Sequence, residues 1–337
     1  MTSEGTVSVL QCSSATEQVA ARLRPFEQRD SEAWDACVSQ AGAGTFLHTR
    51  RFLSYHAQRF EDRSLLVEDG RGGVSALFPA ALDPADNSTV VSHPGITYGG
   101  LLHDGNLVGS ECLRTLQAIC RHYSAQGLRR LRYKAVPSIY HWMPAQDDLY
   151  ALFRMDASLY RRDLSCAIDL SSRATSSERR RRGLKKALGK GVEVVEGFDR
   201  VREFWNVLEE NLFSRHQRKP VHTLEEILLL HGRFPAEIRL LVAVLGDEVV
   251  AGTLLFDSVR VLHSQYTASS ARGREISALD AVFEAAIALA TRERRRYFDF
   301  GVSTEDSGLQ LNDGLHDFKA GFGGAGVAHD FYEVQLA

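Results

Sequence analysis

Hydrophobic and polar positions along the first half of the chain fall into blocks that predict alternating helices and strands. The expected order is helix 45–60, hairpin 64–79, strand 90–102, helix 112–126 and strand 128–136. The two helices have apolar residues at a spacing of three and four, and the hairpin alternates around Asp69-Gly70, a pair typical of tight turns. Pro94 and Gly95 interrupt the strand 90–102.

The second half repeats this order of blocks. It is expected to run helix 201–213, helix 224–230, hairpin 238–256, strand 261–269, helix 277–290 and strand 297–300. Gly246-Asp247 supplies the hairpin turn. Matching blocks lie roughly 170 residues apart, and each half has a tyrosine in or beside its middle strand, Tyr98 and Tyr266. This pattern indicates a duplicated α/β unit with mixed sheets.

The length supports two domains. A chain of 337 residues is long for one core and comfortable for two of roughly 150 residues each. We place a mobile N-terminus at 1–20, a first domain at 21–165 and a second at 166–337, which a basic helix at about 178–190 opens.

Charge and cysteine content exclude several classes of protein. A net charge of −3 argues against a generally basic nucleic-acid binder, so no DNA partner is expected and any nucleic-acid contact must be local. The five cysteines form no CxxC pair, and the histidines lack metal-ligand spacing, so no metal site is predicted. No secretory leader or apolar run of about 18 residues is visible, which favours a cytoplasmic protein without a transmembrane segment.

The segment between the halves is strongly basic. Ser177 is a good N-cap for a helix that begins at Glu178. Its cations are Arg179, Arg180, Arg181, Arg182, Lys185, Lys186 and Lys190. They form either a solvated helical face or a stripe that contacts the phosphates of a nucleic acid.

The stretch from Tyr297 to Gly324 is the strongest candidate for a substrate site. An aromatic strand, FDFG, breaks at Gly301, and a polar loop leads to GLHDFKAGFG. Here Lys319 stands between Phe318 and Phe322, which predicts a partly enclosed lysine on one wall of a cleft.

The order of elements and the FDFG ending resemble the GNAT acyltransferase fold. Two tandem copies, with FDFG followed by GLHDFKAGFG, resemble the Fem-type (FemABX-like) aminoacyl-tRNA-dependent transferases. The resemblance implies transfer of an amino acid from aminoacyl-tRNA to an amine or hydroxylamine of a small molecule or cell-wall precursor, which forms an amide. Aminoacyl-tRNA would be a co-substrate, and no cofactor would be needed.

The resemblance also assigns residues. Lys319 matches the lysine of the family's FK motif, which stabilises the negative charge of the tetrahedral intermediate. Tyr266 matches the tyrosine of the penultimate strand and is expected to be catalytic together with Lys319. Arg215 stands where the family has an arginine and is expected to bind substrate. Asp299 and His316, close to the motif in sequence, and Tyr98, in a glycine-rich segment, complete the expected substrate-binding set.

Two other functions stay open. The first is an acyl-CoA-dependent N-acyltransferase of the same superfamily, with acetyl-CoA as donor. Its phosphate-binding loop would be Ala271 to Ser277, ARGREIS, which has Gly273 but lacks a second glycine. The other is a non-catalytic pair of GNAT-like domains that acts as a binding module.

Overall fold

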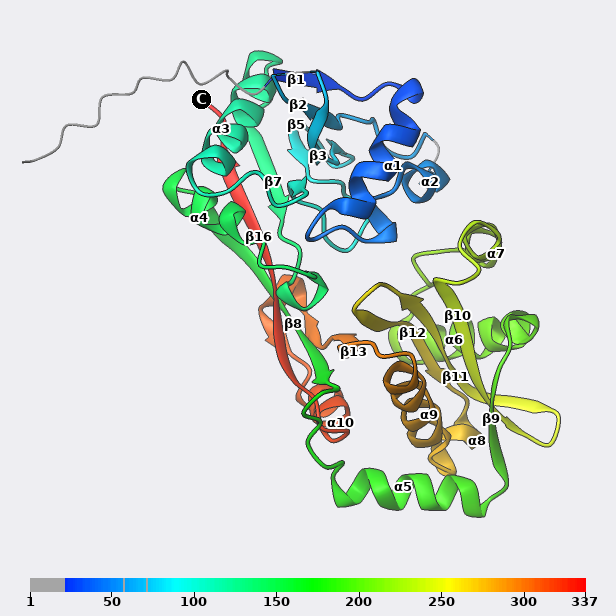
Figure 1. Cartoon of the computed structure of the whole chain (residues 1–337). Helices are drawn as coiled ribbons and strands as arrows, with labels where there is room; N and C mark the ends of the chain where they lie inside the picture. The colour runs from blue at the N-terminus through cyan, green and yellow to red at the C-terminus, as the bar shows by residue number, and fades with distance from the viewer. Residues whose placement is uncertain (1–21, 57, 71) are drawn as a thin grey trace, which may run out of the picture.

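The computed structural model describes residues 22–56, 58–70 and 72–337, and the side chains of residues 215 and 216 lie outside this description. The predicted mobile segment 1–20 falls outside the described residues. Figure 1 shows two lobes, one from each half of the chain, which the long strands β8 and β16 connect.

A ten-stranded mixed sheet runs through both lobes. Its order is β4 (Ala81–Asp83), β5 (Asp86–Val91), β7 (Arg130–Lys134), β16 (Ala325–Gln335), β8 (Ser158–Asp169), β13 (Tyr297–Val302), β12 (Val261–Ser269), β11 (Glu248–Asp257), β10 (Ile238–Leu245) and β9 (Val192–Glu196). A four-stranded sheet in the first half consists of β1 (Arg22–Pro25), β2 (Leu65–Glu68), β3 (Val74–Phe78) and β6 (Leu102–His103). The short strands β14 (Thr304–Glu305) and β15 (Gln310–Leu311) pair with each other.

Helices cover the sheets in both halves. The first half has α1 (Ser31–Gln40), α2 (Arg50–Leu53), α3 (Ser110–Ala125) and α4 (Asp147–Arg154). The second half has α5 (Glu178–Gly189), α6 (Val201–His216), α7 (Leu224–Arg233), α8 (Ala271–Glu275), α9 (Ala278–Arg292) and α10 (Asp313–Ala320). The 3-10 turns are η1 (Gln28–Asp30), η2 (Phe46–His48), η3 (Ser54–His56), η4 (Ser138–Tyr140), η5 (Phe198–Arg200) and η6 (Asp306–Gly308).

Two predicted elements differ from the structure. The single helix expected at 45–60 is broken into η2, α2 and η3, because Thr49 leaves the helical conformation and caps α2 through the Phe52 amide. The strand expected at 90–102 is a loop after Val91, and only Leu102–His103 pair again. His93, just before Pro94, has a φ of 64°, which ends the strand.

The duplication is visible in the strand pairing. In the first half Thr89–Val91 pair in parallel with Arg130–Arg132, and in the second half Val261–His263 pair in parallel with Tyr297–Asp299. Each half also has an antiparallel hairpin, β2–β3 or β10–β11. The fold is therefore a pair of tandem GNAT-like units.

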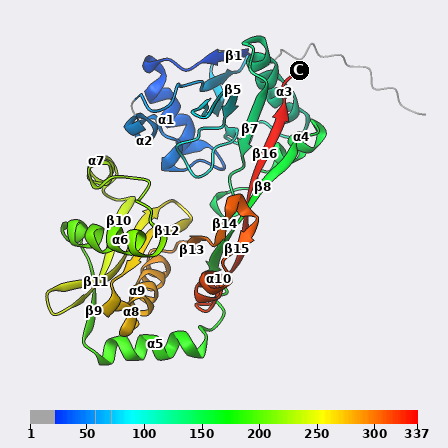
Figure 2. The same ribbon diagram turned by 180° about the vertical axis from the view of Figure 1, so that it is seen from behind.

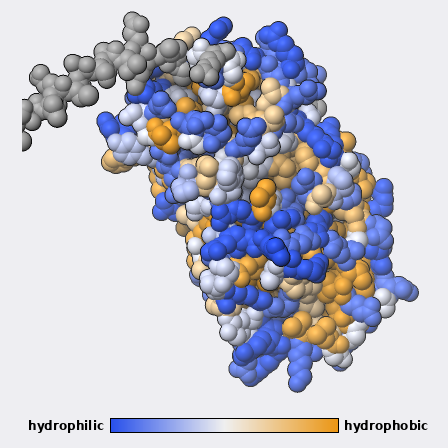
Figure 3. All heavy atoms as spheres, viewed as in Figure 1, coloured by the Kyte–Doolittle hydropathy of each residue, from blue (hydrophilic) through white to orange (hydrophobic). Residues whose placement is uncertain are grey.

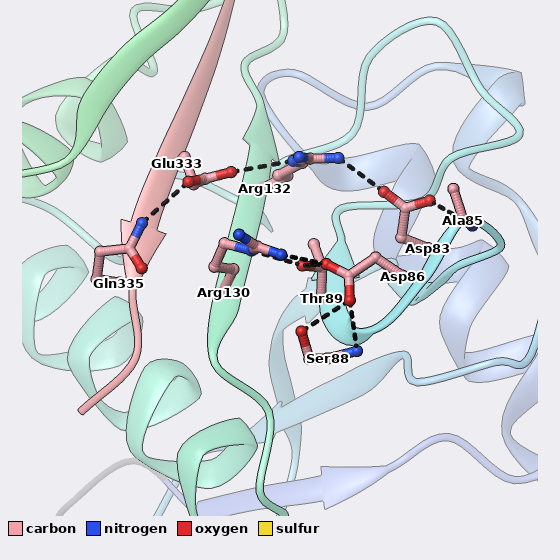
Figure 4. A network of polar contacts seen from close by, with 9 residues as sticks. All are labelled: Asp83, Ala85, Asp86, Ser88, Thr89, Arg130, Arg132, Glu333 and Gln335. Atoms are coloured by element: carbon pink, nitrogen blue, oxygen red, sulfur yellow. Dashed lines mark hydrogen bonds and ion pairs between the residues drawn. The ribbon is translucent and has the colours of Figure 1, made fainter.

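The halves exchange strands. β8 runs without a break across residue 165, the predicted domain boundary, and pairs with β13 of the second half. β16 returns in the opposite direction and pairs with β7 of the first half. Figure 4 shows polar contacts between β16 and its neighbours in the first half. Arg132 on β7 binds both Glu333 on β16, at 3.1 Å, and Asp83 on β4, at 2.8 Å.

One hydrophobic core spans the boundary between the halves. Phe46 of the first half packs against Phe234 and Phe256 of the second half, with ring centroids 5.3 and 5.5 Å apart. A second core lies between the sheet and α9, on the opposite face from α6 and α7. Figure 2, seen from behind, also shows α9 and α6 on opposite faces of this sheet.

Candidate functional site

The candidate site lies where β12 and β13 separate. The two strands pair over three positions only, after which β12 continues along β11 as far as Ser269. β13 turns away at Gly301, whose φ of 77° favours glycine. Parallel strands that part in this way leave backbone groups and a gap between them, and here the gap opens into a cavity of about 980 Å³.

The wall of this cavity is basic. Six of its lining residues are cationic and two are acidic, Asp280 and Glu305. The cationic ones are Arg179, Arg180, Arg182, Lys186, Arg274 and Lys319. A cavity with this balance of charge suits a ligand that carries phosphates.

Lys319 lies at the wall of the cavity on α10. Asn312 caps this helix by accepting a hydrogen bond from the Leu315 amide at 3.0 Å, which sets Leu315, Phe318 and Lys319 toward the cavity. Lys319 is 6% exposed, and its Nζ donates to the carbonyls of Gly301 at 2.9 Å and Val302 at 2.6 Å.

The electrostatics of Lys319 suit a substrate contact. Burial lowers the pKa of its ammonium group to about 8, while the nearby Asp299 favours the charged form. An ammonium has three donors, and two are used by the carbonyls, so one N–H remains for a substrate oxygen.

Asp299 has no exposed surface. Its carboxylate accepts hydrogen bonds from Tyr140 (2.9 Å), His263 (2.8 Å), the Gly301 amide (3.0 Å) and Ser165. Burial opposes its ionisation, but His263 and the other donors hold the pKa of the carboxyl below its usual value. We expected Asp299 to contact substrate directly; instead it reaches the site only through its partners.

Tyr266 does not line the cavity with Lys319, although we expected the two to share a site. Its ring packs edge-on against Trp205 on α6, with centroids 5.5 Å apart. Its hydroxyl meets Nδ1 of His222 at 2.7 Å, and Nε2 of His222 meets Tyr55 of the first half at 3.0 Å. Regular alternation along β12 is interrupted opposite Leu254 and Leu255, and Tyr266 lies in the core between the halves.

The other expected substrate-binding residues are spread out. Tyr98 is buried against Tyr140, with ring centroids 4.6 Å apart, and lines a void of only about 10 Å³. His316 is half-buried on α10 and is not among the residues that line the large cavity. Arg215 belongs to the last turn of α6, and its side chain lies outside the described part.

The basic helix α5 begins as predicted, with Ser177 as its N-cap. Arg180 is buried and binds Asp280 at 3.0 Å, Arg182 binds Glu178, and Lys186 donates to the Glu275 carbonyl at 2.5 Å. The remaining cations are exposed and form no ion pair with any described residue: Arg179, Arg181, Lys185 and Lys190. α5 lies at the lower edge in Figure 1, and this edge is largely hydrophilic in Figure 3.

Three residues in or beside the site were not predicted as site residues: Arg274 and Asp280 line the cavity, and His263 binds Asp299 next to it. His263 approaches Asp299 only through the register of β12 against β13, which the sequence does not reveal. Asp280 lies in the first turn of α9, where acidic residues are common, so the sequence does not distinguish it as a residue of the cavity wall.

No group of His, Cys, Asp or Glu within the described residues is arranged to hold a metal ion. No helix in the described ranges is long and apolar enough to cross a membrane.

Comparisons with known proteins concern the fold of the chain. Residues 171–319 match the model of the acetyltransferase (GNAT) domain, so this part of the chain is similar to that family. A search of curated protein sequences finds no significant match.

Solved structures share the fold along nearly the whole chain. FemX is similar at 12% identity and a TM-score of 0.66, over 94% of this chain and 97% of that one. L-PGS from Bacillus licheniformis is similar at 13% identity and a TM-score of 0.62, over 92% and 93%. The C-terminal domain of a putative lysylphosphatidylglycerol synthetase from Agrobacterium fabrum is similar at 9% and 0.59, over 90% and 92%.

Proposed function

We propose that this protein is an aminoacyltransferase that moves an amino acid from aminoacyl-tRNA to an amine-bearing acceptor and forms an amide. The observation that carries the proposal is the cavity between β12 and β13, with Lys319 on its wall and five further cations around it. The fold that the chain shares with FemX supports the same class of reaction.

The reaction needs little beyond positioning and charge stabilisation. The ester of an aminoacyl-tRNA is already activated, so the site must hold a neutral amine against its carbonyl carbon. Negative charge then develops on the carbonyl oxygen. The free N–H of Lys319 stabilises this oxyanion, and the carbonyls of Gly301 and Val302 hold the ammonium in place.

The exposed cations of α5 fit the donor. Arg179 and Arg182 belong to both the helix and the cavity wall, so the basic surface is continuous with the site. A tRNA whose acceptor end enters the cavity would bring its phosphates along this helix. The acceptor is an amine or hydroxylamine of a small molecule or cell-wall precursor.

The beginning of α9 argues against the acyl-CoA alternative. A pyrophosphate bound there would face the carboxylate of Asp280, which already occupies the first turn of the helix and binds Arg180. Gly273, the one glycine of the candidate phosphate loop, is explained by packing, since a Cβ there would lie 2.2 Å from the Val250 carbonyl oxygen.

The test is an acyl-transfer assay with separate donors. The protein is incubated with candidate amines and either a mixed pool of charged tRNA, the same pool digested with RNase beforehand, or a set of acyl-CoA thioesters. Amide formation with intact charged tRNA alone supports the proposal. Formation with the digested pool or with acyl-CoA alone refutes it, and inactivity in all arms together with tight tRNA binding favours a binding module.

A further inference from the structure

The geometry points to His263 as the general base of this acyl transfer, with Asp299 as the residue that positions it. The inference rests on the proposed function, because it assigns a second group to the same site. It applies equally to an amine that attacks an aminoacyl ester or an acyl thioester.

His263 and Asp299 form a buried dyad at the end of the paired region. They are direct partners in the parallel register of β12 and β13, and Nδ1 of His263 lies 2.8 Å from a carboxylate oxygen of Asp299. The carboxylate is fully buried, whereas the imidazole keeps 15% of its side-chain surface exposed. Of the two side chains only the imidazole has exposed surface, and it lines the void of about 10 Å³ next to the large cavity.

The hydrogen bonds around Asp299 fix the tautomer of His263. Burial disfavours the charged carboxyl, yet His263 and the other donors keep the pKa of Asp299 low, so the group is an anion that can only accept. Nδ1 of His263 must then carry a proton. In the neutral ring, Nε2 is left with a free lone pair, which is the state that a base needs.

His263 is close to Lys319 through Gly301. A Cβ on Gly301 would lie 3.3 Å from Cε1 of His263, the carbon next to Nε2. The carbonyl of the same glycine accepts the hydrogen bond from Lys319 at 2.9 Å. The base and the oxyanion-stabilising cation thus flank the point where the two strands part.

The void that His263 lines and the large cavity share one lining residue, Gln265. Ser264 and Gln265, the next residues along β12, line the cavity. Gln265 also lines the void of about 10 Å³ beside His263, Tyr98 and Tyr140, which has room for about one water molecule. A base acts directly or through one such water.

The transfer moves one proton from the amine to the leaving oxygen. As the amine nitrogen bonds to the carbonyl carbon, one proton passes from that nitrogen to Nε2 of His263. The tetrahedral intermediate then expels the ribose oxygen of the tRNA, and the proton returns from His263 to this leaving oxygen. The products are an amide and a free hydroxyl, and the imidazole is neutral again.

The titratable groups around His263 come from four elements and from the loop that contains Tyr98. They are Asp299 of β13, Lys319 of α10, His329 of β16, Tyr140 of η4 and Tyr98. Burial lowers the pKa of His329, so this neighbour is neutral near pH 7. Because several groups could shape the pH profile, the test compares the pH profiles of variants. It does not attribute a limb of the wild-type profile to His263 from that profile alone.

The kinetic test uses His263→Gln and His263→Ala in the full chain, with His231→Gln as a matched control. Like His263, His231 is a partly buried histidine. Its ring has a hydrogen bond to a backbone carbonyl and stacks on Phe198, away from the cavity. With whichever donor the wild type uses, we expect His263→Gln to lose kcat on the order of 10²–10⁴-fold while its KM changes little. Its pH profile should lose the acid limb, and free imidazole should partly restore His263→Ala.

Wild-type kcat in His263→Gln, or an unchanged acid limb, would overturn the inference without touching the proposed function. A wild type that fails with charged tRNA but works with acyl-CoA would refute the proposed function alone. Nitrogen NMR of the imidazole tests the inference without any activity. We expect the Nδ1–H tautomer of His263 in the wild type and its loss in Asp299→Asn; an Nε2–H tautomer in the wild type would exclude a role as base.

Discussion

The phenol of Tyr140 donates a hydrogen bond of 2.9 Å to the carboxylate of Asp299, across the boundary between the two halves. Tyr140 belongs to η4 of the first half, and Asp299 lies at the end of the paired region of β13 in the second half. The first half therefore contributes directly to the shell that holds the dyad.

Tyr140→Phe should destabilise the protein by about 1–3 kcal/mol, because a buried carboxylate loses one of its donors. Urea unfolding measures this change. Tyr150→Phe, at an exposed tyrosine of α4, is the control and should leave the free energy of unfolding within about 0.5 kcal/mol. Equal stability of the two variants would show that Tyr140 does not support Asp299.

Lys319→Ala should reduce kcat on the order of 100-fold or more, the usual effect of losing one oxyanion donor. Lys185→Ala, at an exposed lysine of α5, is the control and should reduce kcat by no more than a few fold. A wild-type kcat in Lys319→Ala would remove the lysine from the mechanism.

The pH dependence of the wild-type kcat should show the titration of Lys319. Its pKa of about 8 lies below the ordinary 10.5 because the side chain is buried. The cation is the active form, so kcat should fall as the pH rises through about 8. The unfolded chain binds more protons than the folded one between about 8 and 10.5, so Lys319 makes stability rise with pH in this window. Unchanged kcat from pH 7 to pH 9 would contradict the assignment.

Charge reversal on α5 should weaken tRNA binding. In Arg179→Glu/Lys185→Glu two exposed cations are lost, and the slope of log affinity against log salt should fall by about one for each lost phosphate contact. Arg114→Glu/Arg121→Glu on the exposed face of α3 changes the charge equally, far from the cavity. Filter binding at several salt concentrations compares them, and equal slopes for both double variants would exclude α5 from the tRNA surface.

Stability should fall as the pH falls from about 6.5 to about 4. Burial lowers the pKa of His48, His56 and His222 to about 4, so over this range the unfolded chain binds protons that the folded chain does not. Thermal unfolding against pH measures the slope. In His56→Leu the slope should be smaller by up to one proton, and an unchanged slope would mean that His56 titrates normally in the folded protein.

Local pattern was enough to predict much of the second half. The hairpin 238–256, the strand 261–269, the cap at Ser177 and the enclosure of Lys319 all depend on residues that are close in sequence, and the structure contains each of them. Their periodicity and turn residues carry this information directly.

The composition of the site could not be predicted in the same way. The face on which Tyr266 lies depends on a β-bulge, a register shift between Leu254 and Leu255 opposite β12. The approach of His263 to Asp299 depends on a parallel register, and the burial of Arg180 depends on how α5 packs against α9. These are relations between distant segments, which periodicity does not encode.

The exchange of β8 and β16 has a consequence for biosynthesis. The edge of β7 is completed by Phe331–Gln335, which follow every other element along the chain. During translation the edge of β7 therefore stays unpaired until the whole second half has been synthesised. Final docking of this strand closes a loop of about 200 residues, so we expect the sheet of the first half to be the slow, chaperone-sensitive part of folding.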